Sequence, residues 1–242
     1  MPPARQLVPP AHPRRDTAAS IACLPRLNQK EEAAKFKLHW SLALEEHFLG
    51  KGAFGRVSLI MDKRTGQLFA RKVFKRKGAA GAAENNMEEV RAAEWLFQRP
   101  HPNVLHPTLA VLLSPSVPRS VHYEHCQMAL SDLWAKQEGI LSANMARKLG
   151  ADLCRGLAHL HHYGCIHRDV KPSNLLLQFD EQTPLTLKIG DFGWLTHYQG
   201  TPSRGEPKQT SGAVTLPYRP PEILMGTAYG FAVDALGLTA AS

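Results

Sequence analysis

The sequence predicts an α+β fold, in which a part rich in strands is followed by a mainly helical part. Short runs of alternating apolar residues flank the stretch GKGAFG, residues 50–55, and a period of two is typical of strands. Residues 142–164 instead carry apolar side chains at helical spacing, over a length that exceeds that of a strand. The chain has 242 residues, of which 43% are hydrophobic, so it can bury the core of one large domain or of two lobes.

The glycines of residues 50–55 are expected to lie between two strands. Residues 36–50 mix aromatic and apolar side chains, and after the glycines Val57, Leu59 and Met61 fall on one side at strand spacing. A dinucleotide-binding fingerprint has to open a helix, whose N-terminus holds the pyrophosphate. The strand spacing therefore argues against a dinucleotide-binding fold.

A turn, a strand and a helix are expected next. KRTGQ, residues 63–67, is typical of a turn, in which Gly66 supplies the conformational freedom. Residues 68–74 are apolar enough for a short strand. Residues 78–98 predict a loop and then a helix, whose apolar residues recur at helical spacing: Met87, Val90, Ala93 and Leu96.

The second part of the chain begins with a long helix, which Ser142 would cap and Gly164 would close. Residues 174–193 predict a hairpin of two short strands. Residues 196–221 are polar, rich in Gly and Pro, and long enough to form a functional loop. The apolar stripe of the long helix consists of Met145, Leu149, Leu153 and Leu157.

Composition sets the expected surroundings of the protein. The net charge of +8 favours acidic or phosphate-bearing ligands without specifying nucleic acid. The cysteines show no paired spacing, which predicts a reducing intracellular compartment, cytoplasmic or nuclear. Because the charge does not specify nucleic acid, we expect no nucleic-acid partner. No apolar run approaches the ~18 residues of a membrane helix, so we expect no membrane partner either. Residues 1–35 are expected to form a disordered tail, with an organelle transit peptide as the alternative, because the first residues are rich in Arg and poor in acids.

Five short motifs follow one another along the chain: GKGAFG at 50–55, ARK at 70–72, EEVRA at 88–92, HRDVKPSN at 167–174 and DFG at 191–193. They occur in the order in which protein kinases carry them. Between residues 36 and 234 the sequence therefore resembles the eukaryotic protein kinase family. The resemblance implies a bilobal fold over residues 36–242, with a small β-rich N-lobe at 36–126 and a larger, mainly helical C-lobe at 127–242.

The resemblance implies transfer of the γ-phosphate of ATP, a reaction that depends mainly on positioning and on charge neutralisation. The glycines would let backbone amides approach the phosphates, with Phe54 covering them. Tyr123 would sit at the back of the adenine pocket, and Leu176 would close that pocket from below. The ATP-binding positions implied are Leu49, Gly50, Lys51, Gly52, Ala53, Phe54, Gly55, Val57, Ala70, Lys72, Glu124, Cys126 and Leu176.

The same resemblance assigns the catalytic and metal-binding residues. Lys72 would bind the phosphates that are not transferred and would pair with Glu89, or with Glu88 as the alternative. Asp169 would accept or orient the proton of the substrate hydroxyl, and Lys171 would neutralise the γ-phosphate. The magnesium ligands implied are Asn174 and Asp191, which both offer the oxygen atoms that a hard cation requires.

Residues in and after the catalytic motifs indicate a subgroup. Lys171 and Thr215 resemble the residues of serine/threonine kinases, and TLPYRPPEIL, residues 215–224, resembles the cyclin-dependent and MAP kinase (CMGC) group. Pro217 and Trp194 depart from the pattern of that group. The group implies a preference for Ser or Thr followed by Pro. The helix that contains EEVRA has no PSTAIRE-like run, so a cyclin-type partner is not indicated.

Alignment on the family's activation segment places Thr210 where cyclin-dependent kinases carry an activating phosphothreonine. Phosphorylation of Thr210 by an upstream kinase would give Arg168 a phosphate to pair with and would order the loop. Ser211 and Thr201 are the alternatives.

Two features leave alternatives open. The cluster of His159, His162, Cys165 and His167 permits a zinc hypothesis, but we favour the simpler interpretation of a helix C-terminus, whose dipole favours partly positive side chains. After Asp234 the chain departs from the family's Asp-x-Trp-Ser-x-Gly pattern, which predicts an incomplete C-lobe. The alternative to an active kinase is therefore a catalytically impaired fragment that acts as a nucleotide-binding or interaction module.

Overall fold

The structure is a computed structural model, which describes part of the chain. In this part no helix is both long and apolar enough to cross a membrane. The described residues are 24, 26–28, 40–42, 48–51, 55–74, 82–114, 117–138, 141–179, 184–197, 222 and 229–239.

The N-terminal half is dominated by a seven-stranded sheet with the order β1-β6-β7-β5-β4-β2, in which β3 also pairs with β4. All neighbouring strands are antiparallel except β1 and β6. The strands are β1 (Arg26–Asn28), β2 (Trp40–Leu42), β3 (Phe48–Lys51), β4 (Gly55–Asp62), β5 (Leu68–Phe74), β6 (Pro107–Ser114) and β7 (Val117–Glu124).

The strands around the glycines and the turn after them are confirmed. β3 and β4 pair antiparallel on either side of the glycine-rich stretch, with Gly50 opposite Val57. The turn between β4 and β5 is closed by Gly66, which has a φ of +72° and donates its N–H to the carbonyl of Asp62 at 2.7 Å. The expected apolar face of β4 includes the buried Leu59, but Ile60 on its other face is wholly buried too.

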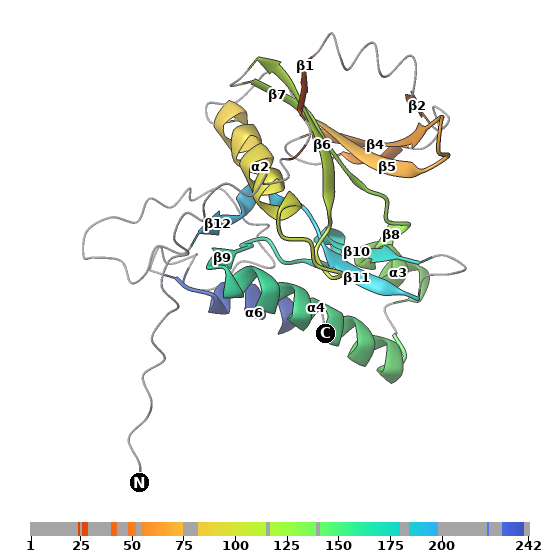
Figure 1. The fold of residues 1–242 in the computed structure, drawn as a ribbon. Coiled ribbons are helices and arrows are strands. Elements are labelled where there is room, and N and C mark those ends of the chain that lie inside the picture. The colour runs from red at the N-terminus through yellow and green to blue at the C-terminus, as the bar shows by residue number, and fades with distance from the viewer. Residues whose placement is uncertain are drawn as a thin grey trace, which may run out of the picture.

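Helix α2 (Ala82–Phe97) packs against the sheet (Figure 1). Three of the four residues of its predicted apolar stripe, Val90, Ala93 and Leu96, are buried in the core, and Met87 is half-buried. The helix contacts β6, β7 and η2, the short 3-10 helix that follows Asp191. Residues of α2 can therefore reach both the sheet and the second lobe.

The second lobe combines helices with small sheets. β10 pairs antiparallel with β11 and β8, and β12 pairs with β9. The hairpin predicted over residues 174–193 is confirmed by β10 and β11. The elements are β8 (Met128–Ala129), α3 (Leu130–Lys136), α4 (Ala143–His162), β9 (Cys165–Ile166), η1 (Pro172–Asn174), β10 (Leu175–Gln178), β11 (Thr186–Ile189), η2 (Phe192–Trp194), β12 (Thr196–His197) and α6 (Ala232–Thr239).

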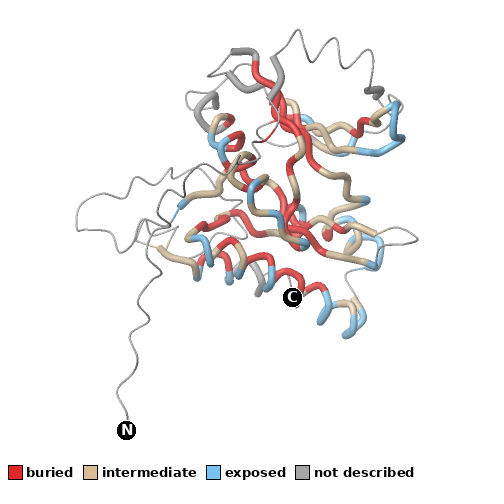
Figure 2. Tube along the Cα trace, in the orientation of Figure 1, coloured by how far each residue is buried: buried red, intermediate tan, exposed pale blue. Residues whose placement is uncertain are grey.

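Helix α4 begins and ends where the sequence predicts. The hydroxyl of Ser142 accepts the N–H of Met145 at 3.3 Å, and Gly164 adopts a φ of +74° after the last turn. The stripe residues Leu149, Leu153 and Leu157 are buried. Figure 2 shows buried residues along the strands of both lobes and along α4, so the core runs through both parts of the chain.

Two sequence-based expectations need correction or extension. The disordered tail predicted for residues 1–35 is wrong for Arg26–Asn28, because this segment pairs as the edge strand β1 with β6. Leu24 is buried as well, while most of residues 1–35 lie outside the described part of the chain. The chain forms a helix, α6, that begins before Asp234 and continues past it, where the family pattern is lost (Figure 1). Asp234 of α6 contacts His161 in the last turn of α4.

Candidate active site

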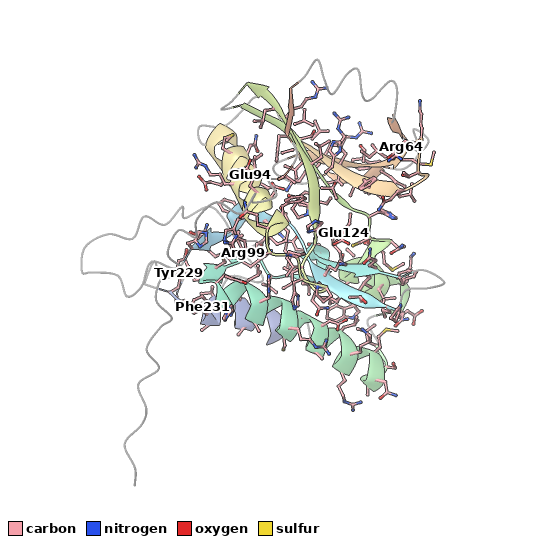
Figure 3. All side chains as sticks on the ribbon, viewed as in Figure 1. Arg64, Glu94, Arg99, Glu124, Tyr229 and Phe231 are labelled. Atoms are coloured by element: carbon pink, nitrogen blue, oxygen red, sulfur yellow. The ribbon has the colours of Figure 1, made fainter. Side chains whose placement is uncertain are left out.

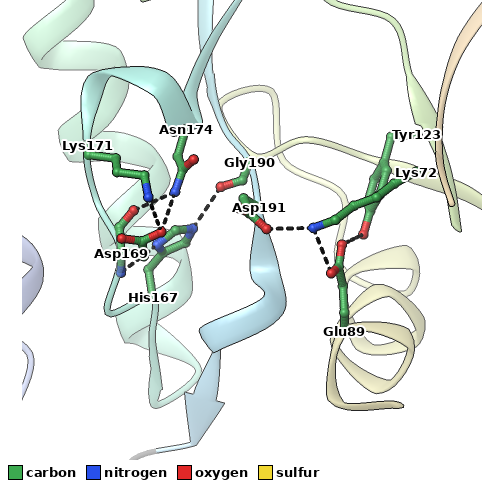
Figure 4. A network of polar contacts seen from close by, with 9 residues as sticks. All are labelled: Lys72, Glu89, Tyr123, His167, Asp169, Lys171, Asn174, Gly190 and Asp191. Carbon is green, nitrogen blue, oxygen red and sulfur yellow. Dashed lines mark hydrogen bonds and ion pairs between the residues drawn. The ribbon is translucent and has the colours of Figure 1, made fainter. Parts of the chain in front are cut away.

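Lys72, Glu89 and Asp191 meet where the sheet, α2 and the second lobe come together (Figure 4). The Nζ atom of Lys72, on β5, lies 2.8 Å from Glu89 Oε2 and 2.7 Å from Asp191 Oδ1. Glu89 is buried on α2, whereas the neighbouring Glu88 is exposed and pairs with Arg91. Of the two candidates from the sequence, the partner of Lys72 is therefore Glu89.

The electrostatics of this group keep Lys72 charged. Burial by itself lowers the pKa of Lys72, but Glu89 and Asp191 outweigh burial and raise this pKa above its ordinary value. For the carboxyl group of Asp191 burial has the opposite effect and raises the pKa, but the ammonium group of Lys72 outweighs burial and lowers this pKa below its ordinary value. The site thus presents a buried cation beside an ionised carboxylate.

A second polar cluster lies around Asp169 in the loop between β9 and η1. Oδ2 of Asp169 accepts hydrogen bonds from Lys171 Nζ at 2.7 Å and from Asn174 Nδ2 at 2.8 Å. The other oxygen, Oδ1, is buried and has no hydrogen-bond partner among the described residues. Because an unpaired buried carboxylate oxygen is costly, Asp169 is poised to accept a hydrogen bond from a bound hydroxyl.

His167 connects the two clusters. Its Nδ1 accepts the N–H of Asp169 at 3.3 Å, so its Nε2 donates to the carbonyl of Gly190 at 2.9 Å. The next residue, Asp191, has a φ of 62°, in the left-handed region that non-glycine residues seldom adopt. This conformation accompanies an Asp191 side chain that faces Lys72 while Phe192 is fully buried.

Asn174 and Asp191 fit the requirements of a magnesium site. Asn174 directs its amide nitrogen to Asp169, which leaves its amide oxygen for another ligand. The lowered pKa of Asp191 keeps its carboxylate ionised at neutral pH. An amide oxygen and an ionised carboxylate are the hard ligands that Mg²⁺ prefers.

The nucleotide-binding positions expected on the strands lie near this group. Val57 is opposite Lys72 across β4 and β5, and Ala70 is opposite Tyr123 across β5 and β7. Leu176 contacts Gly190 from β10: a Cβ added to that glycine would lie 3.0 Å from Leu176 Cδ1. The sheet and β10 thus each place apolar side chains near the group of Lys72, Glu89 and Asp191.

The expected phosphate-binding glycines fall into two kinds. At Gly55 a Cβ would lie 2.3 Å from the carbonyl oxygen of Val73, so packing alone demands glycine. At Gly50 a Cβ would meet no described atom within 4 Å, so packing does not explain this glycine. Leu49 is exposed and Lys51 belongs to β3, while Gly52, Ala53 and Phe54 lie outside the described residues.

The segment between the lobes contains Glu124 and Cys126. The N–H of Glu124 already donates to the carbonyl of His106 at 3.0 Å, so a backbone contact to adenine from Glu124 would use its carbonyl. Its carboxylate accepts from Lys188 at 3.0 Å and so connects the sheet to β11. Burial raises the pKa of the Cys126 thiol to about 12, which keeps this thiol protonated.

Two structural contacts of the site were not predicted. The hydroxyl of Tyr123 donates to Glu89 Oε1 at 3.2 Å, and the carboxylate of Asp234 accepts the backbone N–H groups of His167 and Arg168, each at 2.8 Å. The sequence contains both residues within recognisable motifs. Neither contact could be found from the sequence, because each joins segments that lie far apart in the chain.

The histidines near the end of α4 form contacts of another kind. His159 Nε2 contacts the carbonyl of Arg99 at 3.1 Å and His161 Nε2 contacts Asp234 at 2.8 Å. Figure 3 shows Phe231 beside this end of α4, and its ring lies 4.9 Å from that of His161. Among the described residues no group of three or more His, Cys, Asp or Glu side chains could hold a metal ion.

A β-rich lobe against a helical lobe, with a Lys–Glu pair between sheet and helix and an Asp-x-Lys-x-x-Asn loop below it, defines the protein kinase fold. Residues 44–241 match the family model described as protein kinase domain. The chain belongs to the protein kinase family.

Relatives among known proteins are kinases of several kinds. A probable serine/threonine-protein kinase of Arabidopsis thaliana is 37% identical over 194 residues, covering 77% of this chain and 25% of that protein. Cyclin-dependent kinase 15 of Mus musculus is 31% identical over 243 residues, covering 93% of this chain and 53% of that protein. The Aurora kinase of Yarrowia lipolytica is 33% identical over 198 residues, covering 78% of this chain and 48% of that protein. The chain thus spans between a quarter and about half of the length of these relatives.

Proposed function

We propose that this protein is a serine/threonine protein kinase that transfers the γ-phosphate of ATP to protein hydroxyl groups. The observation that supports it most is the combination of a buried Lys72 cation, held by Glu89 and Asp191, with an Asp169 carboxylate that keeps one oxygen unpaired. Phosphoryl transfer needs these two elements, a cation for the phosphates and an acceptor for the hydroxyl proton.

Each residue has a separate task in this proposal. Lys72 binds the non-transferred phosphates, and Glu89 fixes its position. Asp169 Oδ1 orients the substrate hydroxyl and accepts its proton, while Lys171, which donates to Oδ2 of the same carboxylate, neutralises charge on the transferred group. Asn174 and Asp191 would hold Mg²⁺, which when bound neutralises phosphate charge.

Regulation through Thr210 extends the proposal. Thr210, Ser211 and Thr201 lie outside the described residues. Arg168, the expected partner of a phosphate, donates from Nε to the carbonyl of Trp194 at 2.7 Å and from Nη1 to the hydroxyl of Tyr229 at 3.0 Å. A phosphothreonine at 210 would add a charge-assisted partner for this guanidinium. The proline preference and the lack of a cyclin partner remain predictions.

The test is phosphate transfer from magnesium-ATP to a generic Ser/Thr protein substrate, in the full chain and in Asp169→Asn. The variant keeps the size of the side chain but removes the proton acceptor. We expect turnover to fall at least about 100-fold, in line with the contribution of general base catalysis, while nucleotide still raises the melting temperature. Equal turnover in both proteins would refute the assignment of Asp169, and nucleotide binding without transfer in the parent would favour an interaction module.

A further inference from the structure

The carboxylate of Glu89 is held at both oxygens, by residues from two different strands (Figure 4). Lys72 on β5 approaches Oε2 at 2.8 Å, and the hydroxyl of Tyr123 on β7 donates to Oε1 at 3.2 Å. Figure 4 shows the Tyr123 side chain reaching down from β7 onto the carboxylate. Glu89 is 1% exposed and Tyr123 5% exposed, so this contact is made out of reach of water.

The two donors differ in how exclusively they serve Glu89. Lys72 also approaches Asp191 at 2.7 Å, and in the proposed function it must bind phosphates as well. Among the described residues, the hydroxyl of Tyr123 donates to Glu89 alone. When Lys72 shares its charge among several anions, Tyr123 therefore remains a donor dedicated to Glu89.

The position of Tyr123 is itself fixed by packing. Its backbone pairs with Ala70 on β5, and its ring centroid lies 6.5 Å from that of Phe192, whose ring packs in turn against His167 at 5.8 Å. The pairing of β7 with β5 and the contact with Phe192 of the second lobe thus together fix the position of the Tyr123 hydroxyl. Displacement of α2 away from the sheet would leave both a buried phenol and a buried carboxylate without this hydrogen bond, which is unfavourable.

We propose that Tyr123 is a positioning residue, whose hydroxyl holds Glu89, and with it α2, in the arrangement that orients Lys72 for phosphate transfer. This inference rests on the proposed function and deepens it. A phenylalanine or leucine at this position would fill the same space but would leave Glu89 Oε1 without its donor. The residue therefore couples the strand behind the expected adenine position to the placement of α2.

The first test needs no activity. Backbone amide hydrogen exchange along α2 is compared in the full parent chain, in Tyr123→Phe and in the control Tyr163→Phe, which removes the phenolic oxygen of an exposed tyrosine. Tyr123→Phe should speed exchange in α2 about 5- to 10-fold, because one hydrogen bond that opposes local opening is lost, and exchange in α4 should stay the same. Exchange in α2 unchanged by Tyr123→Phe would overturn the proposal.

A double-mutant cycle shows whether Tyr123 acts through Glu89. In a Glu89→Ala background the hydroxyl has lost its acceptor, so adding Tyr123→Phe should no longer change α2 exchange. An equal effect in both backgrounds would mean that the hydroxyl acts elsewhere and would overturn the inference.

Kinetics separate this inference from the proposed function. In an active parent, Tyr123→Phe should lower kcat about 3- to 10-fold with KM for ATP changed less than about twofold, because positioning rather than binding is lost. An inactive parent refutes the proposed function, and the hydrogen exchange of α2 then decides whether Tyr123 holds the helix. An active parent with unchanged kcat in Tyr123→Phe would overturn the positioning role.

Discussion

The carboxylate of Asp234, on helix α6, holds the backbone of Arg168 in the loop between β9 and η1: Oδ1 accepts the Arg168 N–H at 2.8 Å. Oδ2 accepts the N–H of His167 at 2.8 Å and contacts His161 Nε2 at the same distance. Asp234 is fully buried, and Arg168 has a φ of 68°. A single buried carboxylate thus satisfies two backbone donors of a loop whose conformation is strained.

Asp234→Asn should destabilise the protein, because the amide group places an N–H donor opposite one of the two backbone donors. One buried donor is left unpaired, at a cost of about 1–3 kcal/mol. Urea unfolding followed by circular dichroism measures the change, with the exposed Glu138→Gln as control. A free energy of unfolding equal to that of the control would show that Asp234 does not hold the loop.

Glu89→Gln and Glu88→Gln form a matched pair on α2. The first removes the charge from the buried partner of Lys72, and the second from an exposed residue that pairs with Arg91. A charge-assisted hydrogen bond contributes about 1.5–3 kcal/mol, so turnover should fall roughly 10- to 100-fold in Glu89→Gln. Turnover of Glu88→Gln should stay within about twofold, since exposed ion pairs contribute little. Steady-state kinetics decide, and equal effects of the two changes would contradict the assignment.

Two glycines of α4 predict opposite outcomes for the same substitution. At Gly156 a Cβ would lie 2.6 Å from the carbonyl oxygen of Asn103 and 2.8 Å from Ile189 Cδ1, whereas at Gly150 it would meet nothing within 4 Å. Gly156→Ala should cost about 1–3 kcal/mol through overpacking, and Gly150→Ala should stabilise the helix by about 0.5–1 kcal/mol. Melting temperatures of the two variants should therefore move in opposite directions. A shift in the same direction would mean that α4 does not pack closely on residues 103 and 189.

His122 predicts a pH dependence of stability. Burial, with a smaller contribution from Arg71, lowers the pKa of His122 from 6.5 to about 3. Between these two pKa values His122 is protonated in the unfolded chain but not in the folded chain. The free energy of unfolding therefore falls as the pH drops below 6.5, by up to about 1.4 kcal/mol per pH unit. His122→Gln should flatten the decline between about pH 6.5 and about pH 4.5, and the exposed His162→Gln should not. Urea unfolding at several pH values tests this, and parallel curves for all three proteins would contradict it.

Local patterns predicted much of the fold and the chemical residues of the site. Helix α4 was predicted from its cap at Ser142, its end at Gly164 and its apolar stripe. Such a prediction is possible because capping and helical period depend on residues that are close in the sequence. Strand spacing placed the glycines between β3 and β4 for the same reason. The choice between Glu88 and Glu89 stayed open in the sequence, since adjacent helical residues face different directions, and packing of α2 on the sheet decides it.

What the sequence did not predict depends on contacts between distant segments. Tyr123 and Glu89 are 34 positions apart, and Arg168 and Asp234 are 66 apart. Neither spacing is a helix or strand period, so only the fold brings these groups together. β1 was missed because a run as short as Arg26–Asn28 gains its order from pairing with β6 and not from its own residues.

The most direct test of the account is a melting curve with and without magnesium-ATP, in the parent chain and in Asp191→Asn, with the exposed Asp132→Asn as control. At about 100 times Kd, nucleotide should stabilise the parent and the control by about 2.7 kcal/mol, roughly 5–10 °C. We expect Asp191→Asn to lose most of this shift, because it loses the ionised oxygen ligand next to Lys72. A full shift in Asp191→Asn, or none in the parent, would contradict a magnesium-nucleotide site at Lys72, Asn174 and Asp191.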